Sequence, residues 1–410
     1  MRPSSAGPPS LDGAAMPEFR RSWKVLFASM VGVSLCVTGL PNYAIGLFTD
    51  PLSREFGWSR SAISLWSVWQ MGALACITPA VGFLIDRFGT RSIALISIPL
   101  FSAAIASMSL LAGDIRMLYL GAVATSVLGG GTIVTLYSKT VNGWFRRGRG
   151  RALGFMGSGI ALASIFGPRL LQPVVDRMGW RAGFLLLALL VLAAFPLVYF
   201  LLFERHPGAP DTSPKTGLTL KQALRTPVFW YQAVTYLLMS LLTNGIMISL
   251  VPFLTDQKFT RADAAAHLGL FGVSSLLGRL ASGFVFDRFR APPVCAAVYF
   301  LAALAAAALA VFGVRFSSAC IIVTGLALGS ETDALSYLTA RYFGMRAYGE
   351  IATLFAVGIA IGNGIGPFAI SRLREASGGY EVPFLVVAAL TAVAAALMAL
   401  LDRHPYLEYT

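Results

Sequence analysis

Long apolar stretches, separated by short polar ones, run through almost the whole of this 410-residue chain. Each is about 20 residues or longer, which is the length that an α-helix needs to cross a bilayer. The pattern predicts twelve membrane-spanning helices. Their ranges are 23–49, 61–85, 91–112, 116–138, 150–173, 182–203, 228–255, 263–286, 292–313, 316–341, 348–371 and 382–401.

Polar residues mark the ends and the middle of the chain. Residues 1–22 are rich in Pro, Ser and Gly and predict a disordered tail, and a second tail follows at 402–410. In the longest internal polar segment, 204–227, Thr219 and Gln222 have the spacing of a capping box for a short surface helix that Pro227 ends. This loop divides the chain into two predicted six-helix bundles, 23–203 and 228–401.

Two motifs of the first predicted bundle recur in the second. The pattern GIA followed by GP begins at Gly159 and again at Gly358, and the pattern GFxxDRF begins at Gly82 and again at Gly283. Both are displaced by about 200 residues, nearly half the chain, which indicates an internal repeat. The predicted fold class is therefore an all-α membrane protein whose two six-helix repeats, pseudo-symmetric and parallel, surround a central cavity.

Composition supports a membrane protein and excludes a soluble one. Only 12% of the residues are charged and 56% are hydrophobic, whereas a typical soluble domain has about 25% charged residues. The net charge of +13 does not indicate nucleic acid, because Lys and Arg gather in alternate loops. By the positive-inside rule we expect both termini in the cytoplasm, in the cell membrane or, in a bacterium, the inner membrane. The lipid bilayer surrounds the protein, no nucleic acid is expected to bind, and a monomer is expected.

Enzyme chemistry is not indicated by the sequence. The cysteines lie in or beside apolar spans without metal-ligand spacing, and they are interpreted as small buried hydrophobes. They are Cys36, Cys76, Cys295 and Cys320. No Ser–His–acid spacing and no phosphate loop is found in the sequence, so we predict no catalytic residue, no metal and no cofactor.

One arginine, Arg279, lies inside the eighth predicted span, among apolar and small residues. An arginine near the bilayer centre costs about 2.5 to 3.5 kcal/mol on insertion-based scales, so it normally faces the bundle interior and marks a solute pathway. Small or polar residues at helical spacing share its face, namely Gly272, Ser275, Ser282 and Gly283. The alternative is a structural arginine that binds a carbonyl or extends to the interface.

The tenth predicted span carries two acids, Glu331 and Asp333. At 1.5 Å rise per residue, Glu331 and Arg279 both lie about 4 to 6 Å below the midplane and could meet across the cavity. Residues two positions apart on a helix point about 200° apart, so only one of the two acids can face the cavity. We expect one of them to neutralise Arg279 in the empty site, and the pattern leaves open which one. The alternative is a permanent structural salt bridge.

The segment Gly82–Arg91, taken with the predicted spans and repeats, resembles the signature loop of the major facilitator superfamily. The resemblance covers nearly the whole chain and implies a transporter with a cytoplasmic gating latch between loop acids and basic partners. It assigns this latch to Asp86, Arg87, Arg91, Asp287 and Arg288. The second copy departs from the motif at Arg290, where the glycine would be, and the alternative is that these charges only set topology and turns.

A narrower resemblance is to the monocarboxylate and oxalate/formate porter branches of that superfamily. It rests on the segment Phe56–Ser61, on Gly278-Arg279 and on the segment Glu331–Gly344. Those branches hold a substrate carboxylate with the arginine of span 8, which implies that role for Arg279. The chain departs from the eukaryotic carriers at Ser275, which stands where they have an aspartate, and in the first span, where it lacks their lysine. It also lacks the second basic residue that the oxalate/formate branch has in span 11.

These features predict a secondary transporter of a small organic anion. A monocarboxylate is favoured because one buried cation matches one carboxylate, which the guanidinium can bind with two parallel hydrogen bonds. A carboxylate that competes for Arg279 would leave the displaced acid desolvated and without its cation, so that acid would bind a proton and give proton–anion symport. Anion exchange is expected instead if the acid keeps its distance.

Other polar residues within the spans are further substrate-binding candidates, although each could equally join helices together. They are Asn42, Tyr43, Tyr137, Asn244 and Asn363. Two other functions stay open: an exporter of drugs or other metabolites, whose transport would not depend on Arg279, and a membrane receptor or enzyme that binds without flux. The identity of the carboxylate and the direction of flux are not determined by the pattern.

Overall fold

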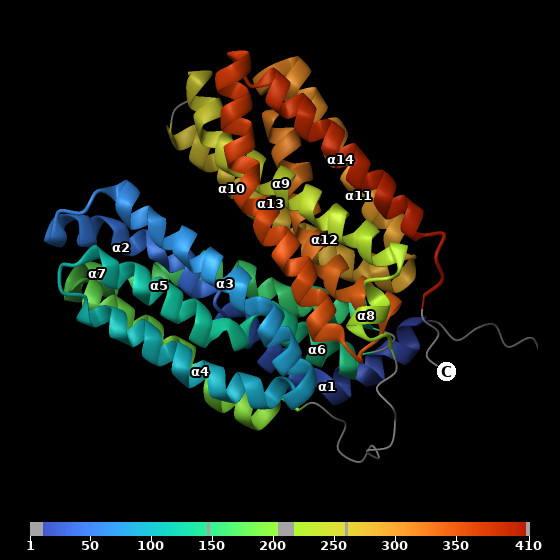
Figure 1. The fold of residues 1–410 in the computed structure, drawn as a ribbon, viewed down its shortest axis with the longest axis horizontal. Helices are drawn as coiled ribbons and strands as arrows, with labels where there is room; N and C mark the ends of the chain where they lie inside the picture. Colours follow the sequence, from blue (N-terminus) through green and yellow to red (C-terminus); the bar gives the residue numbers. More distant parts are fainter. Residues whose placement is uncertain (1–10, 146–147, 204–216, 259–260, 407–410) are drawn as a thin grey trace, which may run out of the picture.

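The computed structural model describes residues 11–145, 148–203, 217–258 and 261–406, and it is helical almost throughout (Figure 1). The first part of the chain forms α1 (Leu11–Ser34), α2 (Leu40–Phe56), α3 (Arg60–Phe88), α4 (Thr90–Ser107), α5 (Ile115–Gly129), α6 (Val134–Trp144) and α7 (Arg149–Leu201). After the short α8 (Leu220–Ala223) come α9 (Pro227–Asp256), α10 (Arg261–Arg288), α11 (Ala291–Phe312), α12 (Ser317–Phe343), α13 (Tyr348–Ser377) and α14 (Glu381–Leu401).

Eight helical stretches of the described residues are long and apolar enough to cross a membrane, which confirms a multi-pass helical membrane protein. Two of these stretches, Arg149–Leu201 and Ala291–Phe343, are 53 residues long, and each contains two of the predicted spans. In the first, Gly179 has a φ of 84° and breaks α7 into two arms, a conformation that costs glycine little. In the second, a 3₁₀ turn at Gly313–Phe316 separates α11 from α12.

Two predicted continuous spans are interrupted in the structure. The range 23–49 is divided between α1 and α2, because the chain leaves the helix after Ser34 and α2 starts again with Pro41 in its first turn. The range 116–138 is divided between α5 and α6 by the 3₁₀ turn Gly130–Thr132, where glycines replace good helix formers.

Part of the N-terminal segment 1–22, which was predicted to be a disordered tail, is helical: α1 begins at Leu11. Contacts with the α6–α7 connection hold this segment: the Phe19 and Phe145 ring centroids are 4.9 Å apart, and Glu18 accepts a hydrogen bond of 3.2 Å from Gly148 N. Residues 1–10 and 407–410 of the predicted tails, and 204–216 of the predicted loop, lie outside the described residues.

The capping box predicted from Thr219 and Gln222 is confirmed at the start of α8. Pro227 does not itself end α8, which stops at Ala223; it begins α9, since proline fits a first helical turn well. Of the cysteines, Cys76 is exposed and the other three are buried, so the prediction of burial is wrong for Cys76.

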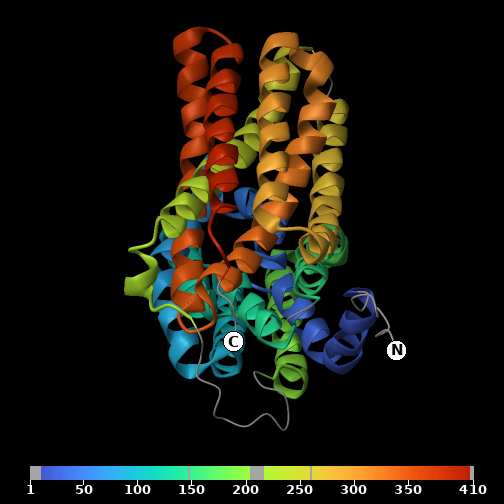
Figure 2. The same ribbon diagram turned by 90° about the vertical axis from the view of Figure 1, so that its right-hand side faces the viewer.

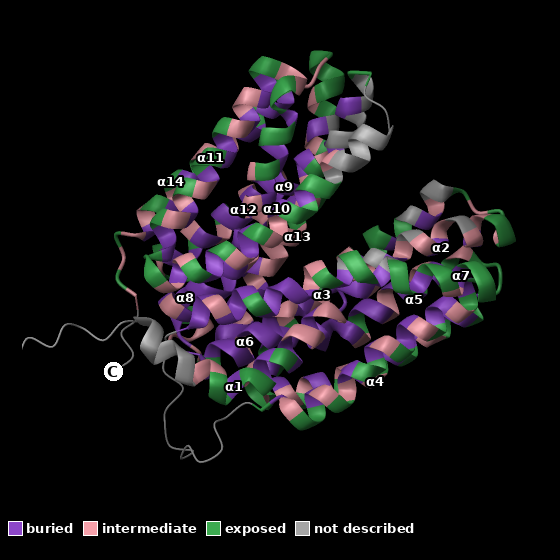
Figure 3. Cartoon of the chain, turned by 180° about the vertical axis from the view of Figure 1, so that it is seen from behind, coloured by how far each residue is buried: buried purple, intermediate pink, exposed green. Residues whose placement is uncertain are grey.

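Helices α1 to α7 form one bundle and α9 to α14 form another (Figures 1 and 2). The two bundles pack together at the end of the molecule where α1 begins, α8 lies and α14 ends, and they diverge toward the opposite end. We call the first of these the closed end. The pairs α3–α13 and α7–α10 join the bundles there, and buried residues are frequent at this junction (Figure 3).

Glycines let the backbones approach closely in both of these helix pairs. A Cβ added at Gly82 of α3 would lie 2.6 Å from the carbonyl oxygen of Gly349 of α13. One added at Gly283 of α10 would lie 2.6 Å from the carbonyl oxygen of Gly150 of α7. The two contacts therefore have matching geometry in the two halves, and small residues are what such close helix packing in membranes requires.

Candidate functional site

Arg279 of α10 lies beside Asp333 of α12. Arg279 is 7% exposed and Asp333 is 3% exposed, and 3.9 Å separates Nη1 of the arginine from Oδ1 of the acid. The other carboxylate oxygen of Asp333 accepts a hydrogen bond of 3.2 Å from Ser282 Oγ, one helix turn beyond Arg279. Of the two acids considered from the sequence, the structure thus brings Asp333 and not Glu331 to the arginine.

The ion pair between Arg279 and Asp333 is loose. Charge-assisted N–H···O bonds are about 2.7–2.9 Å long, well below the 3.9 Å found here. Nη1 of Arg279 is buried and has no hydrogen-bond partner among the described residues. The guanidinium therefore keeps donor capacity for a further acceptor, such as a carboxylate.

The first bundle covers this ion pair through Gly157 of α7. A Cβ added there would lie 2.7 Å from both Cδ and Nη1 of Arg279, and 3.2 Å from Oδ1 of Asp333. The pair therefore lies at the junction of the bundles, on the α10 face that packs against α7. Nothing in the spacing of the glycines near Gly157 points to the arginine.

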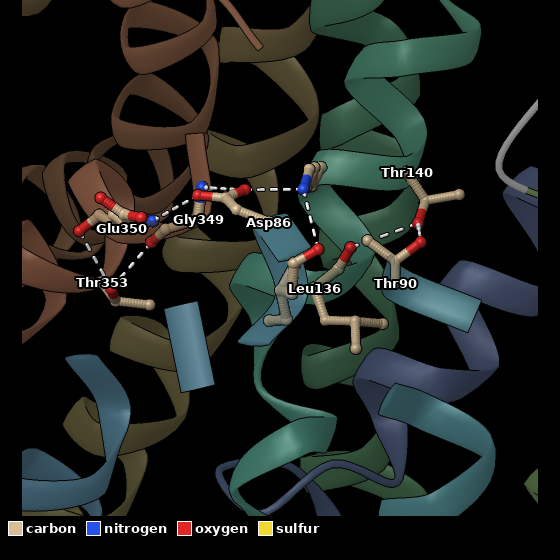
Figure 4. A network of polar contacts seen from close by, with 9 residues as sticks. Asp86, Thr90, Leu136, Thr140, Gly349, Glu350 and Thr353 are labelled. Carbon is tan, nitrogen blue, oxygen red and sulfur yellow. Dashed lines mark hydrogen bonds and ion pairs between the residues drawn. The ribbon is translucent and has the colours of Figure 1, made fainter. Parts of the chain in front are cut away.

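Asp86 of α3 caps a helix of the other bundle. Its carboxylate accepts hydrogen bonds from Gly349 N (3.0 Å) and Glu350 N (2.9 Å) in the first turn of α13, and it pairs with Lys139 of α6 at 2.6 Å (Figure 4). Thr353 adds a hydrogen bond of 2.7 Å to the Gly349 carbonyl within that turn. An anion is stabilised at a helix N-terminus by free N–H groups and by the helix dipole.

Asp287 of α10 caps the matching helix of the first bundle. It accepts hydrogen bonds from Gly150 N (2.6 Å) and Arg151 N (3.1 Å) in the first turn of α7, and from Arg151 Nε (3.1 Å). We call the contacts of Asp86 and Asp287 the two latches. Each half thus supplies the acid that caps a helix of the other half.

The predicted basic partners of the latch lie elsewhere. Arg87 is exposed, with its guanidinium carbon 5.4 Å from the Phe88 ring centroid, and Arg91 donates a hydrogen bond of 2.7 Å to the Tyr199 carbonyl. Arg288 is exposed and forms no ion pair among the residues that the structure describes. The latch acids bind backbone N–H groups together with Lys139 and Arg151, which the motif did not indicate.

Four buried polar residues form a further set of contacts between the two bundles, and we call them the central seal: Ser138, Asn142, Ser336 and Tyr348. Asn142 of α6 donates hydrogen bonds of 3.2 Å to the Ser336 carbonyl and to Tyr348 Oη. The hydroxyls of Ser336 and Ser138 are 3.0 Å apart. These contacts join the first bundle to α12 and α13, and no sequence signal singled them out.

The remaining substrate-binding candidates are used in packing or stand apart from the ion pair. Asn244 donates a hydrogen bond of 2.6 Å to the backbone carbonyl of Asn363, which joins α9 to α13. Tyr137 is fully buried and packs against Gly32 of α1. Asn42 is half-buried, and the side chain of Tyr43 lies outside the described residues.

The family model described as Major Facilitator Superfamily matches residues 31–367, which is most of the chain. The chain belongs to this superfamily. It is therefore a transporter and not an enzyme, and the resemblance found in the sequence is confirmed at the level of the superfamily.

Transporters from distant organisms resemble the chain along nearly its full length. MFS transporter asaE of Aspergillus flavus is 25% identical over 385 residues, which cover 92% of this chain and 85% of that protein. Monocarboxylate transporter 11 of Homo sapiens is 25% identical over 407 residues, covering 95% and 83%. The probable nitrate/nitrite transporter NarK2 of Mycobacterium tuberculosis is 25% identical over 390 residues, covering 89% and 93%.

Solved structures of other transporters share the fold. The Escherichia coli fucose:proton symporter FucP has a TM-score of 0.74 at 15% identity, covering 93% of this chain and 99% of FucP. A bacterial homologue of the iron transporter ferroportin in its outward-facing state has a TM-score of 0.75 at 15% identity, covering 94% and 100%. At this identity the likeness concerns the fold alone.

Proposed function

We propose that this chain carries a small organic anion, most simply a monocarboxylate, together with a proton, by alternating access through twelve spans in two six-helix halves. The observation that carries the proposal is the buried and loose pair of Arg279 and Asp333 at the junction of the bundles. A single cation with an unused donor fits one carboxylate, since a second substrate charge would stay unpaired in a medium of low dielectric.

Binding exchanges one anion for another at Arg279. The substrate carboxylate accepts two hydrogen bonds from the planar guanidinium and displaces Asp333. Asp333 then keeps only its hydrogen bond from Ser282, and a buried acid without its cation binds a proton. The loaded site has the same net charge as the empty one, so the anion and the proton cross together.

The latches and the central seal hold the closed end together in the state described here. We place this end in the cytoplasm, together with both termini, because the arginines and lysines of the chain gather in the loops on this side. In that orientation the bundles diverge toward the outside, and the structure is outward-facing. Inward opening breaks the contacts of Asp86 and Asp287 with the opposite helices.

Two relatives support an anion as the solute. The human relative is named a monocarboxylate transporter, and NarK2 is named a probable nitrate/nitrite transporter. Nitrate is the second candidate for this chain, because it is also a planar anion with a single charge. The ion pair of Arg279 and Asp333 favours transport of a carboxylate together with a proton. Both carboxylates and nitrate are therefore included in the first assay.

The experiment that tests the proposal is uptake of labelled monocarboxylates, dicarboxylates and nitrate into proteoliposomes, with and without an inward proton gradient. Arg279→Gln removes the buried cation, and Arg315→Gln removes an exposed arginine as the matched control. We expect uptake of a monocarboxylate that the gradient stimulates, that Arg279→Gln abolishes and that the control retains. Uptake that survives Arg279→Gln would show that the arginine is structural.

A further inference from the structure

A second group of buried polar side chains lies inside the second bundle, on the opposite side of α12 from Asp333. Glu331 of α12 is 2% exposed, and Gln232 and Tyr236 of α9 and Tyr299 of α11 are fully buried. Glu331 interacts electrostatically with Tyr236 and Tyr299, which places these groups close to one another. We call these four residues the inner cluster.

The inner cluster leaves most of its polar atoms without hydrogen bonds. Both carboxylate oxygens of Glu331, the hydroxyl of Tyr299 and the amide nitrogen of Gln232 have no partner among the described residues. The one contact is 3.5 Å long, between Tyr236 Oη and Gln232 Oε1. A bare buried carboxylate costs far more free energy than the neutral acid.

No cation among the described residues forms an ion pair with Glu331. The described groups that interact with it are the two tyrosines, with Cys295 close to both of them, while Arg279 is on the other side of α12 beside Asp333. Glu331 therefore holds a proton of its own in this state. This proton is independent of the one that Asp333 is proposed to bind.

Two tyrosines, Tyr236 and Tyr348, lie near the inner cluster. Tyr236 interacts electrostatically with both Glu331 and Tyr348. The hydroxyl of Tyr348 accepts a hydrogen bond from Asn142 of the first bundle and donates one of 3.4 Å to the Ser336 carbonyl. Tyr348 is thus part of the central seal, which would separate if the closed end opened.

We propose that Glu331 is a second proton-binding site, separate from the anion site, which exchanges its proton through Tyr236 and Tyr348 when the closed end opens. The carboxyl O–H of Glu331 breaks as its proton passes to Tyr236, Tyr236 passes its own proton to Tyr348, and Tyr348 gives one to water. Glu331 is left as a carboxylate that hydrogen bonds from Tyr236, Tyr299 and Gln232 can stabilise. Glu331 takes up its next proton from the outer side of the membrane once the closed end has closed again, so that the proton crosses with the anion.

This inference rests on the proposed function only in its consequence for stoichiometry. If Asp333 and Glu331 each carry one proton, two protons cross with one monocarboxylate, and each cycle moves one net positive charge. Transport then responds to membrane potential. Without the proton of Glu331, transport is electroneutral.

The first test uses the purified protein and needs no substrate. Infrared difference spectra between acidic and alkaline buffer report protonated carboxyl groups, and Glu331→Gln is compared with wild type and with Asp333→Asn. We expect a carboxyl band that changes with pH in wild type and Asp333→Asn and is absent in Glu331→Gln. A band that Glu331→Gln leaves unchanged, or that never changes with pH, overturns the proposal.

The second test measures uptake in proteoliposomes with an inside-negative potassium diffusion potential. For one net charge, a tenfold potassium gradient raises accumulation by up to about tenfold. We expect this stimulation, the ratio of uptake with the potential to uptake without it, in wild type and its loss in Glu331→Gln. Stimulation that survives Glu331→Gln overturns the proposal. If wild type transports no carboxylate, the proposed function fails and the infrared test still decides the role of Glu331.

Discussion

At the scale of single residues, Arg279 is held so that its charge is neutralised but its donors are not all used. The acid opposite is 3.9 Å away, and Nη1 has no hydrogen bond among the described residues. If Arg279 and Asp333 formed a tight ion pair with two hydrogen bonds, breaking it would reduce the binding free energy of a substrate carboxylate. The loose pair makes this loss smaller. The distance between Arg279 and Asp333 is thus part of the proposed binding mechanism.

Gly157 provides a test of this geometry, because a methyl group there would meet Cδ and Nη1 of Arg279 at 2.7 Å. We expect Gly157→Ala to displace the guanidinium and to raise KM for the anion about tenfold, which corresponds to about 1.4 kcal/mol. Uptake kinetics in proteoliposomes measure it. Gly364→Ala is the matched control, since a Cβ at Gly364 meets no atom within 4 Å. Equal KM values for the two variants would show that the space left by Gly157 does not affect anion binding at Arg279.

At the scale of helices, the molecule is joined by acids that cap helices of the opposite half. Asp86 caps α13 and Asp287 caps α7, and a glycine contact lies next to each cap. Both halves contribute one acid and one capped helix, so the closed end carries two equivalent latches. Because an acid at a helix N-terminus contributes about 0.3–1 kcal/mol when exposed and up to about 2 when partly buried, the two together can bias a conformational equilibrium.

Removing the latch charges should therefore favour opening of the closed end. We expect Asp86→Asn and Asp287→Asn each to raise the accessibility of the central seal about fivefold, for a loss of about 1 kcal/mol, and the double variant to raise it further. The readout is thiol labelling of Ser336→Cys in a protein whose native cysteines are replaced by alanine. Labelling rates that stay at the wild-type level in the double variant would contradict a latch role.

Several features of the helices could be predicted from the sequence, and others depend on packing. The long apolar stretches and the repeated GFxxDRF motif were sufficient to predict a membrane protein and its superfamily, because both are local features of the sequence. The breaks after Ser34 and at Gly130–Thr132 lie inside apolar stretches, where hydropathy alone cannot detect them. The repeat also extends to Gly150 and Gly349, a signal that could have indicated the capped helices.

The choice between Glu331 and Asp333 could not be made from the sequence. The period of a helix shows that the two acids diverge, but the rotation of α12 is set by its packing against α10 and against the core of the second bundle. Asp86 and Gly349 are separated by 263 residues, so their contact likewise depends on how the halves dock. Partners of this kind appear only when both halves are seen together.

At the scale of the whole molecule, the ion pair and both latches lie where the two bundles meet. Asp333 and Arg279 are covered by Gly157 of the opposite half, and the central seal joins α6 to α12 and α13. In the proposed mechanism, rocking of the halves would therefore change the surroundings of Arg279 and of the closed end together. This shared location is what alternating access requires of a coupled transporter.

The most direct test of the proposed coupling is anion accumulation against a gradient by Asp333→Asn, measured beside anion counterflow in the same proteoliposomes. With its proton acceptor removed but Arg279 retained, we expect the variant to exchange internal for external monocarboxylate. It should lose the proton-driven accumulation, about tenfold per unit of pH gradient for each coupled proton, that wild type sustains through Asp333. Wild-type accumulation in Asp333→Asn would contradict the account, because the proton would then travel without the acid that faces the anion site.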